Sequence, residues 1–460
     1  MKCLVLTTTL SVTLLVLLTL PIAVRAQSTE HQKHCGEGDG RSQQNNSQNV
    51  TYTFSVLHSF TGKPDGGHPF AGGVLDCAGN FYGTTSSGGT FDGGTVFKID
   101  KHGNETVLYN FTGATDGGYP ESGLVIDPAG NLYGTTAEGG SGAGVVFKLD
   151  RRGQETVLYA FTDFTDGPPR GTMVRDAAGN LYGITQLGGA TSNGTVFKID
   201  LTGKETVLHA FTGPDGSEPF GNLVIDSAGN LYGMTMDGGA SSNCFAGCGV
   251  VFKVDADGHE SVLHSFSGPD GGNPEAGLVM DSAGNLYGAT TGGGASKQGA
   301  VFKLDKNGTE TVLYSFTGAA DGGAPIAAMA LDGEGNLYGT TDSGGTPCGF
   351  PGCGVVFKVD KTGKETVLHA FTGNDGDQPL DMVRDSAGNL YGTTLEGGNQ
   401  SCDIVFTSSC GVVFKLTASR EGDSECEGGE GSQDNGRAKR DDPDCVRSDK
   451  DPPSGTVKSE

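Results

Sequence analysis

The ten residues DPAGNLYGTT, from Asp127 to Thr136, decide how this chain folds, because the chain repeats them. Six close copies start at Asp76, Asp176, Asp226, Asp281, Asp332 and Asp385. The asparagine of the motif recurs every 49 to 55 residues, at Asn80, Asn131, Asn180, Asn230, Asn285, Asn336 and Asn389. A unit of about 50 residues that occurs seven times lies within the range of β-propeller blades.

Each unit holds four short apolar segments, as the second unit illustrates. They are Gly123–Asp127, Asn131–Thr136, Gly144–Asp150 and Glu155–Phe161. The segments are rich in Val, Phe, Tyr and Thr and are bounded by Gly and Asp, which is typical of β-strands. Several are apolar at consecutive positions, which indicates strands that are buried on both faces between stacked sheets.

Two kinds of Asp-x-x-Gly turn join the strands. In Asp127-Pro-Ala-Gly130 the Asp opens the turn, the Pro presets φ and the Gly accepts a left-handed backbone, which predicts a type I turn. The same spacing recurs between the third and fourth strands, starting at Asp100, Asp150, Asp200, Asp255, Asp305 and Asp360. We therefore expect these aspartates to shape hairpins rather than to carry chemistry.

Seven four-stranded antiparallel units predict an all-β fold, a seven-bladed β-propeller. Thr53–Phe60, which resembles the fourth segment of a unit, precedes the first complete unit. The last unit ends with its third segment, Gly411–Thr417, and has no fourth segment. We therefore expect the N-terminal strand to pair in the last blade as its outer strand. Such a closed ring removes the exposed sheet edges that an open stack would leave.

The sequence outside the repeats predicts three further regions. Residues 1–26 resemble an export signal, with Lys2, an apolar run from Leu4 to Val24 and a cleavage site after Ala26. An uncleaved membrane anchor is the alternative, because the apolar run is long for a signal. Residues 27–52 and the acidic, Gly-rich residues 418–460 are predicted to be disordered, since they have too little apolar surface to offset the entropy of ordering. Residues 53–417 form the predicted propeller.

The repeated pattern also resembles a known family. Gly-Leu-Val-x-Asp-x-Ala-Gly-Asn-Leu-Tyr-Gly-Thr-Thr, followed by Gly-Val-Val-Phe-Lys-x-Asp, is similar to the GloVer repeat of exported bacterial proteins called choice-of-anchor tandem repeat proteins. The resemblance covers Thr53–Thr417 and implies a propeller-like secreted or surface protein, but no activity. The C-terminus departs from the family label because it has no recognisable anchor. Kelch repeats are the second resemblance, and the absence of Trp counts against them.

Charge and motifs limit the partners and cofactors. A formal net charge of -25 argues against nucleic acid or an anionic membrane surface as a partner. The metal-site and hydrolase motifs HExxH and GxSxG are absent, and we expect no catalytic residue, no metal site and no membrane span in the mature chain. Calcium is the one ion to consider, because Asp255–Glu260 begins like a calcium loop, but that stretch lacks the later ligands.

The cysteines favour disulfides, since ten of them remain after an export signal. Insertions between the second and third strands of blades four, six and seven each hold one pair: Cys244 and Cys248, Cys348 and Cys353, Cys402 and Cys410. Zinc is the alternative, but it needs four ligands and no His stands beside these pairs. The pairing of Cys35, Cys77, Cys426 and Cys445 stays open.

One face of the ring is the candidate ligand face. The fourth-to-first and second-to-third connections share this face, here called the upper face. The Cys-bearing loops present Phe245, Phe350, Ile404 and Phe406, and the fourth-to-first loops present Asp215, Asp270, Asp321 and Asp375. These eight residues are candidate ligand contacts. The alternatives are neutral insertions for the loops, and Asp-Gly turn geometry for the acids.

Three further recurrent features fit scaffolding. One position of the fourth strand holds either a histidine or a tyrosine: His58, His209, His264, His369, Tyr109, Tyr159 and Tyr314. This exchange indicates an amphipathic rim. We expect the outer strands of different blades to lie too far apart for these histidines to share a metal ion. A third-strand Lys and a fourth-strand Glu, such as Lys98 and Glu105, are expected to be cross-strand neighbours. Arg175 and Arg384 replace an apolar first-strand residue and are expected to be solvent-exposed.

These observations predict a secreted or cell-surface propeller that acts as a recognition or scaffold module. Its ligand is an extracellular glycan or protein, bound on the upper face near blades four, six and seven. Periplasmic retention is compatible with the same signal. The alternative is an exported hydrolase or lyase acting on a polysaccharide, which should break the repeat with unlike acids, bases or nucleophiles near the channel.

Overall fold

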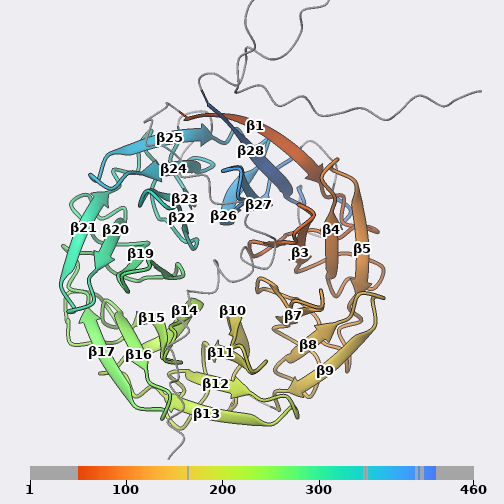
Figure 1. The fold of residues 1–460 in the computed structure, drawn as a ribbon, viewed down its shortest axis with the longest axis horizontal. Helices are drawn as coiled ribbons and strands as arrows, with labels where there is room; N and C mark the ends of the chain where they lie inside the picture. The colour runs from red at the N-terminus through yellow and green to blue at the C-terminus, as the bar shows by residue number, and fades with distance from the viewer. Residues whose placement is uncertain are drawn as a thin grey trace, which may run out of the picture.

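The computed structural model describes residues 50–162, 165–345, 348, 351–398, 402–404 and 409–420. The described residues form 28 strands in seven four-stranded antiparallel sheets, which confirms the predicted seven-bladed propeller. Figure 1 shows the sheets arranged around a central axis, with the innermost strands toward the middle. Within this part of the chain, no helix has the length and apolarity needed to cross a membrane.

The blades follow the chain in order. Blades one to three consist of β2 (Val74–Leu75), β3 (Phe81–Thr85), β4 (Thr95–Ile99), β5 (Glu105–Asn110), β6 (Val125–Ile126), β7 (Leu132–Thr135), β8 (Val145–Leu149), β9 (Glu155–Ala160), β10 (Pro169–Arg175), β11 (Leu181–Thr185), β12 (Thr195–Ile199) and β13 (Glu205–Ala210). Blades four to six consist of β14 (Ser217–Ile225), β15 (Leu231–Asp237), β16 (Val250–Val254), β17 (Glu260–Ser265), β18 (Val279–Met280), β19 (Leu286–Thr290), β20 (Ala300–Leu304), β21 (Glu310–Ser315), β22 (Ala330–Leu331), β23 (Leu337–Thr341), β24 (Val355–Val359) and β25 (Glu365–Ala370).

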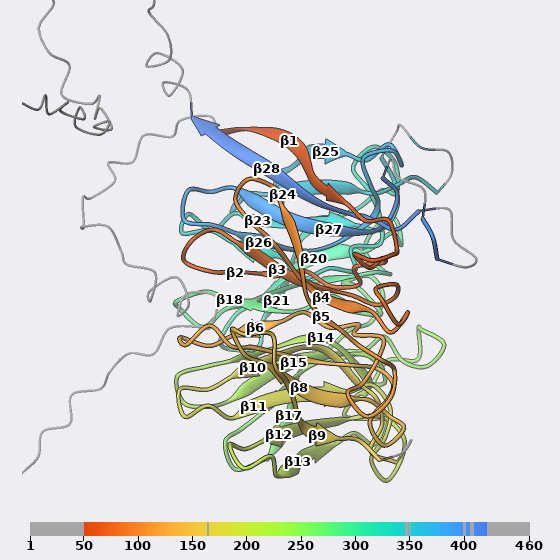
Figure 2. The ribbon, with the colours of Figure 1, turned by 90° about the vertical axis from the view of Figure 1, so that its right-hand side faces the viewer.

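The seventh blade closes the ring as predicted. It consists of β26 (Asp377–Arg384), β27 (Leu390–Glu396), β28 (Val412–Arg420) and the N-terminal strand β1 (Val50–Ser59). Figures 1 and 2 show β1 and β28 side by side although they come from opposite ends of the chain. Their register runs from Val50 opposite Arg420 to Ser59 opposite Val412. Both strands therefore extend three residues beyond the predicted boundaries at 53 and 417, because each supplies the other with backbone partners.

The repeated motif folds into one hydrogen-bonded unit per blade. In the second blade, Asp127 accepts hydrogen bonds from the Asn131 backbone and side-chain amides at 2.8 Å and from the Tyr133 hydroxyl at 3.0 Å. Burial raises the pKa of Asp127, but the bonds from Asn131 and Tyr133 outweigh it and the net pKa is lowered. The Asn and Tyr side-chain bonds recur in all seven blades, so the turn prediction is confirmed.

The glycine that follows the tyrosine makes room for the core. Gly134 lies opposite Phe147 in the sheet, and a Cβ on Gly134 would stand 2.7 Å from that ring. Phe147 in turn packs edge-on against Phe111 of the preceding blade, with ring centroids 5.1 Å apart. Equivalent phenylalanine pairs join all seven blade interfaces at 5.0 to 5.3 Å. Glycine and phenylalanine at these positions thus build the interlocking core.

Two expectations about charged residues were wrong. Lys98 does not pair with Glu105, because the hairpin places Ile99 opposite Glu105 and Lys98 opposite Thr106, and the lysine lies over the Tyr82 ring. All seven third-strand lysines make this contact. Arg175 is not simply solvated, because its guanidinium lies over Tyr133 of the preceding blade and its Nε is buried. Arg384 does the same over Tyr338.

Candidate functional site

The repeat is irregular at one inner position. A proline near the start of each innermost strand occurs in every unit, and the residue after it varies between aromatic, acidic, basic and aliphatic side chains. The seven residues are Phe70, Glu121, Arg170, Phe220, Glu275, Ile326 and Leu380. The proline itself is present in all seven units, so the variation begins directly beside a constant residue.

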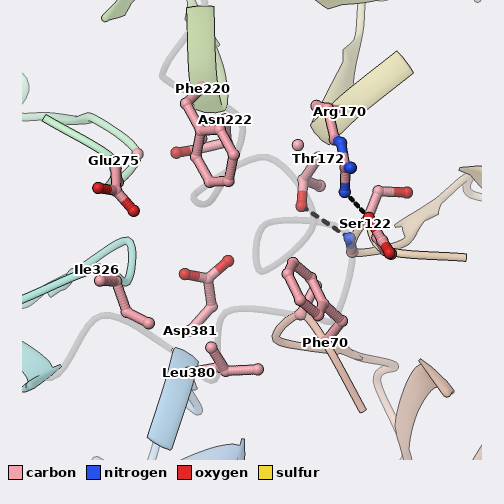
Figure 3. Close-up of a pocket in the computed structure, with 16 residues that line it drawn as sticks. Phe70, Ser122, Arg170, Thr172, Phe220, Asn222, Glu275, Ile326, Leu380 and Asp381 are labelled. Atoms are coloured by element: carbon pink, nitrogen blue, oxygen red, sulfur yellow. Dashed lines mark hydrogen bonds and ion pairs between the residues drawn. The ribbon is translucent and has the colours of Figure 1, made fainter. Parts of the chain in front are cut away.

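The structure brings these seven residues together around one axial pocket of about 120 Å³. Figure 3 shows side chains from different blades pointing into a common space, with Glu275 and Asp381 across from Arg170. Pro169 pairs with Thr185, the last residue of β11, so the pocket lies at the upper ends of the inner strands. A water site needs only about 10–15 Å³, so the pocket has room for several waters or one small group.

An ion pair joins two blades at the pocket wall. Arg170 of blade three contacts the carboxylate of Glu121 of blade two, and both side chains are 24% exposed. Burial lowers the pKa of Arg170. The Nε of Arg170 is buried and has no hydrogen-bond partner among the described residues. One guanidinium nitrogen is thus committed to Glu121 while another polar group of the same side chain stays unsatisfied, an arrangement that is uncommon in native interiors.

Asp381 is the most deeply embedded acid of the pocket. Its carboxylate accepts a hydrogen bond from the Ala328 amide of blade six at 2.6 Å, and the Gly72 amide of blade one also donates to it. Burial raises its pKa to about 6, although both backbone donors lower it. Protein surrounds the carboxylate, but part of the residue keeps contact with solvent through the pocket. Asp381 is therefore an acid that is partly protonated near neutral pH.

The innermost strand that carries Asp381 belongs to a unit that is one residue shorter at this point. Pro379 and Asp385 are six residues apart, whereas the corresponding Pro and Asp of the other six units are seven apart. The corresponding inner positions of other blades hold small residues such as Ala71 and Gly171. Asp381 thus brings a carboxylate to a part of the pocket wall where other blades have small side chains.

Glu275 lies in acidic surroundings. Burial raises its pKa, a hydrogen bond from Thr291 Oγ1 at 3.3 Å opposes the rise, and the charges of Asp342 and Asp237 add to it. Burial also raises the pKa of Asp237 and of Asp342. This side of the pocket therefore favours cationic or hydroxyl-rich groups over anions.

The residue before the shared proline is held in a left-handed backbone in six units. These residues are His68, Tyr119, Glu218, Asn273, Ala324 and Gln378, with φ between 51° and 55°. Such a backbone costs about 1–3 kcal/mol for a residue other than Gly. Bonds to the preceding blade hold it, for example from the Glu218 amide to Asn193 O at 2.9 Å. Backbone strain therefore surrounds the pocket, as it often surrounds binding sites.

The predicted upper-face acids lie elsewhere. Asp215 accepts hydrogen bonds from the Thr212 amide and hydroxyl at 2.8 Å, and its other oxygen lies 3.0 Å from His209 Nε2. Asp270 and Asp375 have the same partners, with Ser267 replacing Thr at the first, and Asp321 binds Thr317 and the Tyr314 hydroxyl. The structure places these four acids one at each of four blade interfaces, and does not bring them together.

The predicted Cys-loop contacts differ from one another. The pairs Cys244–Cys248, Cys348–Cys353 and Cys402–Cys410 are disulfides, as predicted. Phe245 is fully exposed. Ile404 instead packs on the loop that holds Gly62 and Gly67, at the edge of the core cluster around Phe60. Phe350 and Phe406 lie outside the described residues, as do Cys35, Cys426 and Cys445, whereas Cys77 is disulfide-bonded.

Sequence reasoning missed the axial pocket. It noted changes in the loops and at Arg175, but not at the residue after each shared proline. The signal was available, since Glu121, Arg170 and Glu275 interrupt an apolar position of the repeat. Asp381 was harder to find, because its unit is one residue shorter, so that counting from the shared Pro and from the shared Asp aligns it with different positions of the other units.

Comparisons with known structures support the fold. Streptogramin B lyase matches over 80% of this chain and 98% of its own, at 11% identity and a TM-score of 0.54. The extracellular domain assigned to a hybrid two-component system of B. thetaiotaomicron matches over 80% of this chain, at 14% identity and a TM-score of 0.53, and this chain spans 41% of that chain's length. At such identities the likeness shows the propeller fold alone. No curated protein matches the sequence.

The sequence itself matches one family model, the Gloeobacter/Verrucomicrobia repeat, over residues 41–246 and again over residues 240–425. The two matches together include all seven blades. They confirm the resemblance that the repeated motif indicates. The chain therefore belongs to the Gloeobacter/Verrucomicrobia repeat family.

Proposed function

We propose that this protein is an extracellular recognition propeller whose axial pocket binds the end group of a glycan. The observation that supports this most is the break in symmetry after the shared prolines. Seven equivalent positions carry Phe, Glu, Arg, Phe, Glu, Ile and Leu, and all of them line one pocket. Unlike side chains that converge on one space offer a ligand an asymmetric set of contacts.

The pocket has the groups that a sugar requires. Phe70 and Phe220 supply apolar ring surfaces, and Asp381, Glu275 and Asn222 supply oxygen acceptors for hydroxyl groups. The buried Oδ1 of Asn222 has no hydrogen-bond partner among the described residues. At about 120 Å³ the pocket is smaller than the roughly 300–1,000 Å³ that buries a drug-sized ligand. It therefore suits one terminal unit rather than the middle of a polymer.

The upper face provides a second contact. The exposed Phe245 projects from the disulfide-closed loop of blade four, on the same face as the pocket mouth. A closed loop loses less entropy on binding than an open one, so it suits a contact with the part of the ligand outside the pocket. The alternative is that the three loops are insertions without a role in binding.

Extracellular placement is part of the proposal. The three disulfides favour an oxidising compartment. One similar propeller is described as an extracellular domain. Both observations agree with the prediction that residues 1–26 are an export signal.

The deciding experiment is a glycan and polysaccharide array with the full chain and three kinds of variant. Asp381→Asn and Phe220→Ala should each weaken binding at least tenfold, because they change the pocket without touching the loops. Asp305→Asn, an equivalent change at an exposed lower-face turn, should leave binding unchanged. Shortening each Cys-bearing loop to the length of Thr291–Ala300 should weaken binding less than the pocket variants do. Binding that survives both pocket variants would overturn the proposal.

An exported polysaccharide-active enzyme is the second candidate, and Asp381 is the observation that favours it. An acid with a pKa of about 6 can donate a proton near neutral pH, as a general acid must. The pocket also brings unlike residues to one place, as catalysis requires. The array glycans that bind should be incubated with the protein and analysed for shortened products. Products that vanish with Asp381→Asn would favour the enzyme, and intact glycans would favour recognition.

A further inference from the structure

Two clusters of metal-ligating side chains lie outside the axial pocket, at the interfaces on either side of blade four. The first consists of His209 on β13, Asp215 in the following loop and Glu260 on β17 of the next blade. In each cluster one ligand atom per residue lies within 4.8 Å of the other two. The second cluster is the same arrangement one blade further on, with His264, Asp270 and Glu310. Outer strands of adjacent blades thus come together, contrary to the expectation from the sequence.

We infer that each cluster is a binding site for a zinc-type divalent cation that links two neighbouring blades. In a tetrahedral zinc site with ligand distances of about 2.0–2.1 Å, the ligand atoms are about 3.3 Å apart. His209 Nε2 and Asp215 Oδ2 are 3.0 Å apart, as are His264 Nε2 and Asp270 Oδ2. Two ligands therefore already stand at almost the required separation, and the glutamate needs a short movement to complete the set.

The glutamates are available as ligands. The Oε1 atoms of Glu260 and Glu310 are buried and have no hydrogen-bond partner among the described residues, a property they share with Glu105, Glu155 and Glu365 at other interfaces, so the close approach of a histidine, an aspartate and a glutamate distinguishes the two clusters. Each glutamate also faces an aspartate across the interface, Asp215 and Asp270 respectively. A buried carboxylate that faces another carboxylate and lacks a donor is costly, and a cation between the two relieves that cost.

The surrounding residues hold the other two ligands in place. In the first cluster, Thr212 occupies Asp215 Oδ1 through its amide and hydroxyl, which leaves Oδ2 directed at His209. The His209 ring packs edge-on against Phe211, with centroids 4.8 Å apart. Ser267 and Phe266 do the same for Asp270 and His264. Such supporting contacts orient the ligands of protein metal sites.

The ligand set favours zinc over calcium. One imidazole nitrogen and two carboxylates suit a borderline cation, and three protein ligands leave a fourth position for water. Calcium takes about 6–8 oxygen ligands, which this interface does not supply. Zinc needs the Nε2 lone pair of the histidine, so binding replaces the His–Asp hydrogen bond and displaces any proton shared between them.

The other interfaces are natural controls. Tyr109, Tyr159 and Tyr314 replace the histidine at three of them, and Phe54 takes the glutamate position beside His369 at the ring closure. His58, Asp65 and Glu105 have the right residue types, but their ligand atoms do not come within 4.8 Å of one another. We therefore expect two sites per chain, although the interface recurs seven times.

A third group, Asp255, Asp257 and His259, carries no such inference. It lies at an exposed turn, where Asp255 Oδ1 already accepts the amides of Asp257 and His259. The Asp255 carboxylate shapes the hairpin, as the first aspartates of the other Asp-x-x-Gly turns do.

The test is a zinc titration of the metal-free full chain by calorimetry, with thermal unfolding as a second readout. The wild-type chain should bind two zinc ions and unfold at a higher temperature with zinc present. His209→Tyr and His264→Tyr should each remove one ion, and the double variant should remove both while staying folded, because tyrosine occupies the same slot in three other blades. Thr212→Val should weaken only the first site, by about 10–100-fold.

Two further variants separate these sites from other histidines. His259→Ala and the double change His31→Ala/His34→Ala should leave the two-ion stoichiometry unchanged. Tyr314→His should add a third ion, because Asp321 and Glu365 already stand in the matching positions. A wild-type chain that binds no zinc, or a His209→Tyr/His264→Tyr chain that still binds two ions, would overturn the inference.

Discussion

Phe54 stacks face to face on His369 across the interface that closes the ring, with ring centroids 3.7 Å apart and planes 4° from parallel. Phe54 stands where the other six blades have a glutamate, such as Glu105. The interface between blades six and seven therefore differs chemically from the other six interfaces. An aromatic contact between β1 and blade six replaces the charged group of the other interfaces.

The first prediction is that Phe54→Glu destabilises the protein by about 2 kcal/mol. The change removes the stacking on His369 and the contact with Phe371, whose ring lies 5.7 Å away, and it places a second carboxylate near Asp375. Urea unfolding should show a lower midpoint with an unchanged slope. Ser55→Thr, which introduces the residue of the other blades at the exposed neighbouring position, is the control and should stay within 0.5 kcal/mol of wild type. Equal stability of the two variants would contradict the prediction.

The second prediction concerns the glycine of the motif. A Cβ at Gly288 would stand 2.7 Å from the tip of the buried Phe302 ring, so Gly288→Ala should destabilise the protein by about 1–3 kcal/mol. Gly333→Ala is the matched control, because Gly333 has open space around its Cβ position and needs no left-handed backbone. Thermal unfolding should separate the two variants clearly, and a Gly288→Ala chain as stable as Gly333→Ala would count against the packing argument.

The third prediction is a stability maximum on the acid side of neutrality. Burial and the facing Asp116 raise the pKa of Glu155 from its ordinary value of 4.5 to about 7, and Glu365 behaves alike beside Asp321. Between these values the folded chain holds a proton that the unfolded chain has lost, so stability should fall as the pH rises from about 4.5 to 7. Aspartates with a lowered pKa, such as Asp127, stabilise the folded chain while they are ionised, so their protonation at still lower pH decreases its stability.

Glu155→Gln/Glu365→Gln should flatten this pH dependence, with a gain of at most about 1 kcal/mol per interface at pH 8 after allowance for solvent screening. Urea unfolding at several pH values between 5 and 8 measures the slope directly. A double variant with the slope of the wild type would show that these two carboxyl groups do not cause it.

The fourth prediction concerns the loop disulfides. Each closes a short loop, so removing the Cys244–Cys248 bond by a double change to Ala should cost about 2 kcal/mol. Peptide mapping without reductant should find this link together with Cys348–Cys353 and Cys402–Cys410. A peptide joining Cys248 to Cys348, or three pairs of unreacted thiols in exported protein, would contradict the assignment.

The architecture was predictable because its causes are local and repeated. Asp127, Asn131 and Tyr133 lie within seven residues of one another, so their hydrogen bonds follow from one short stretch. Counting strand types also predicted that β1 pairs with β28, because one fourth strand is extra at the N-terminal end and one is missing from the last unit. The Lys98–Glu105 pairing failed because the turn places Ile99 opposite Glu105, while Tyr82 of the other neighbouring strand stands opposite Lys98 and receives the lysine over its ring.

The sequence by itself determined the blade and the number of blades, since each depends on hydrogen bonds and packing within about 50 residues, and the count of strand types determined how the ring closes. Only the tertiary structure decided which residues meet across blades. Arg170 meets Glu121, Asp381 meets the Ala328 amide, and Glu260 meets Asp215, each pair through residues that the chain separates by 45 or more positions. These contacts between blades depend on the curvature of the closed ring. That curvature results from the rotation between each sheet and the next, and no single repeat shows it.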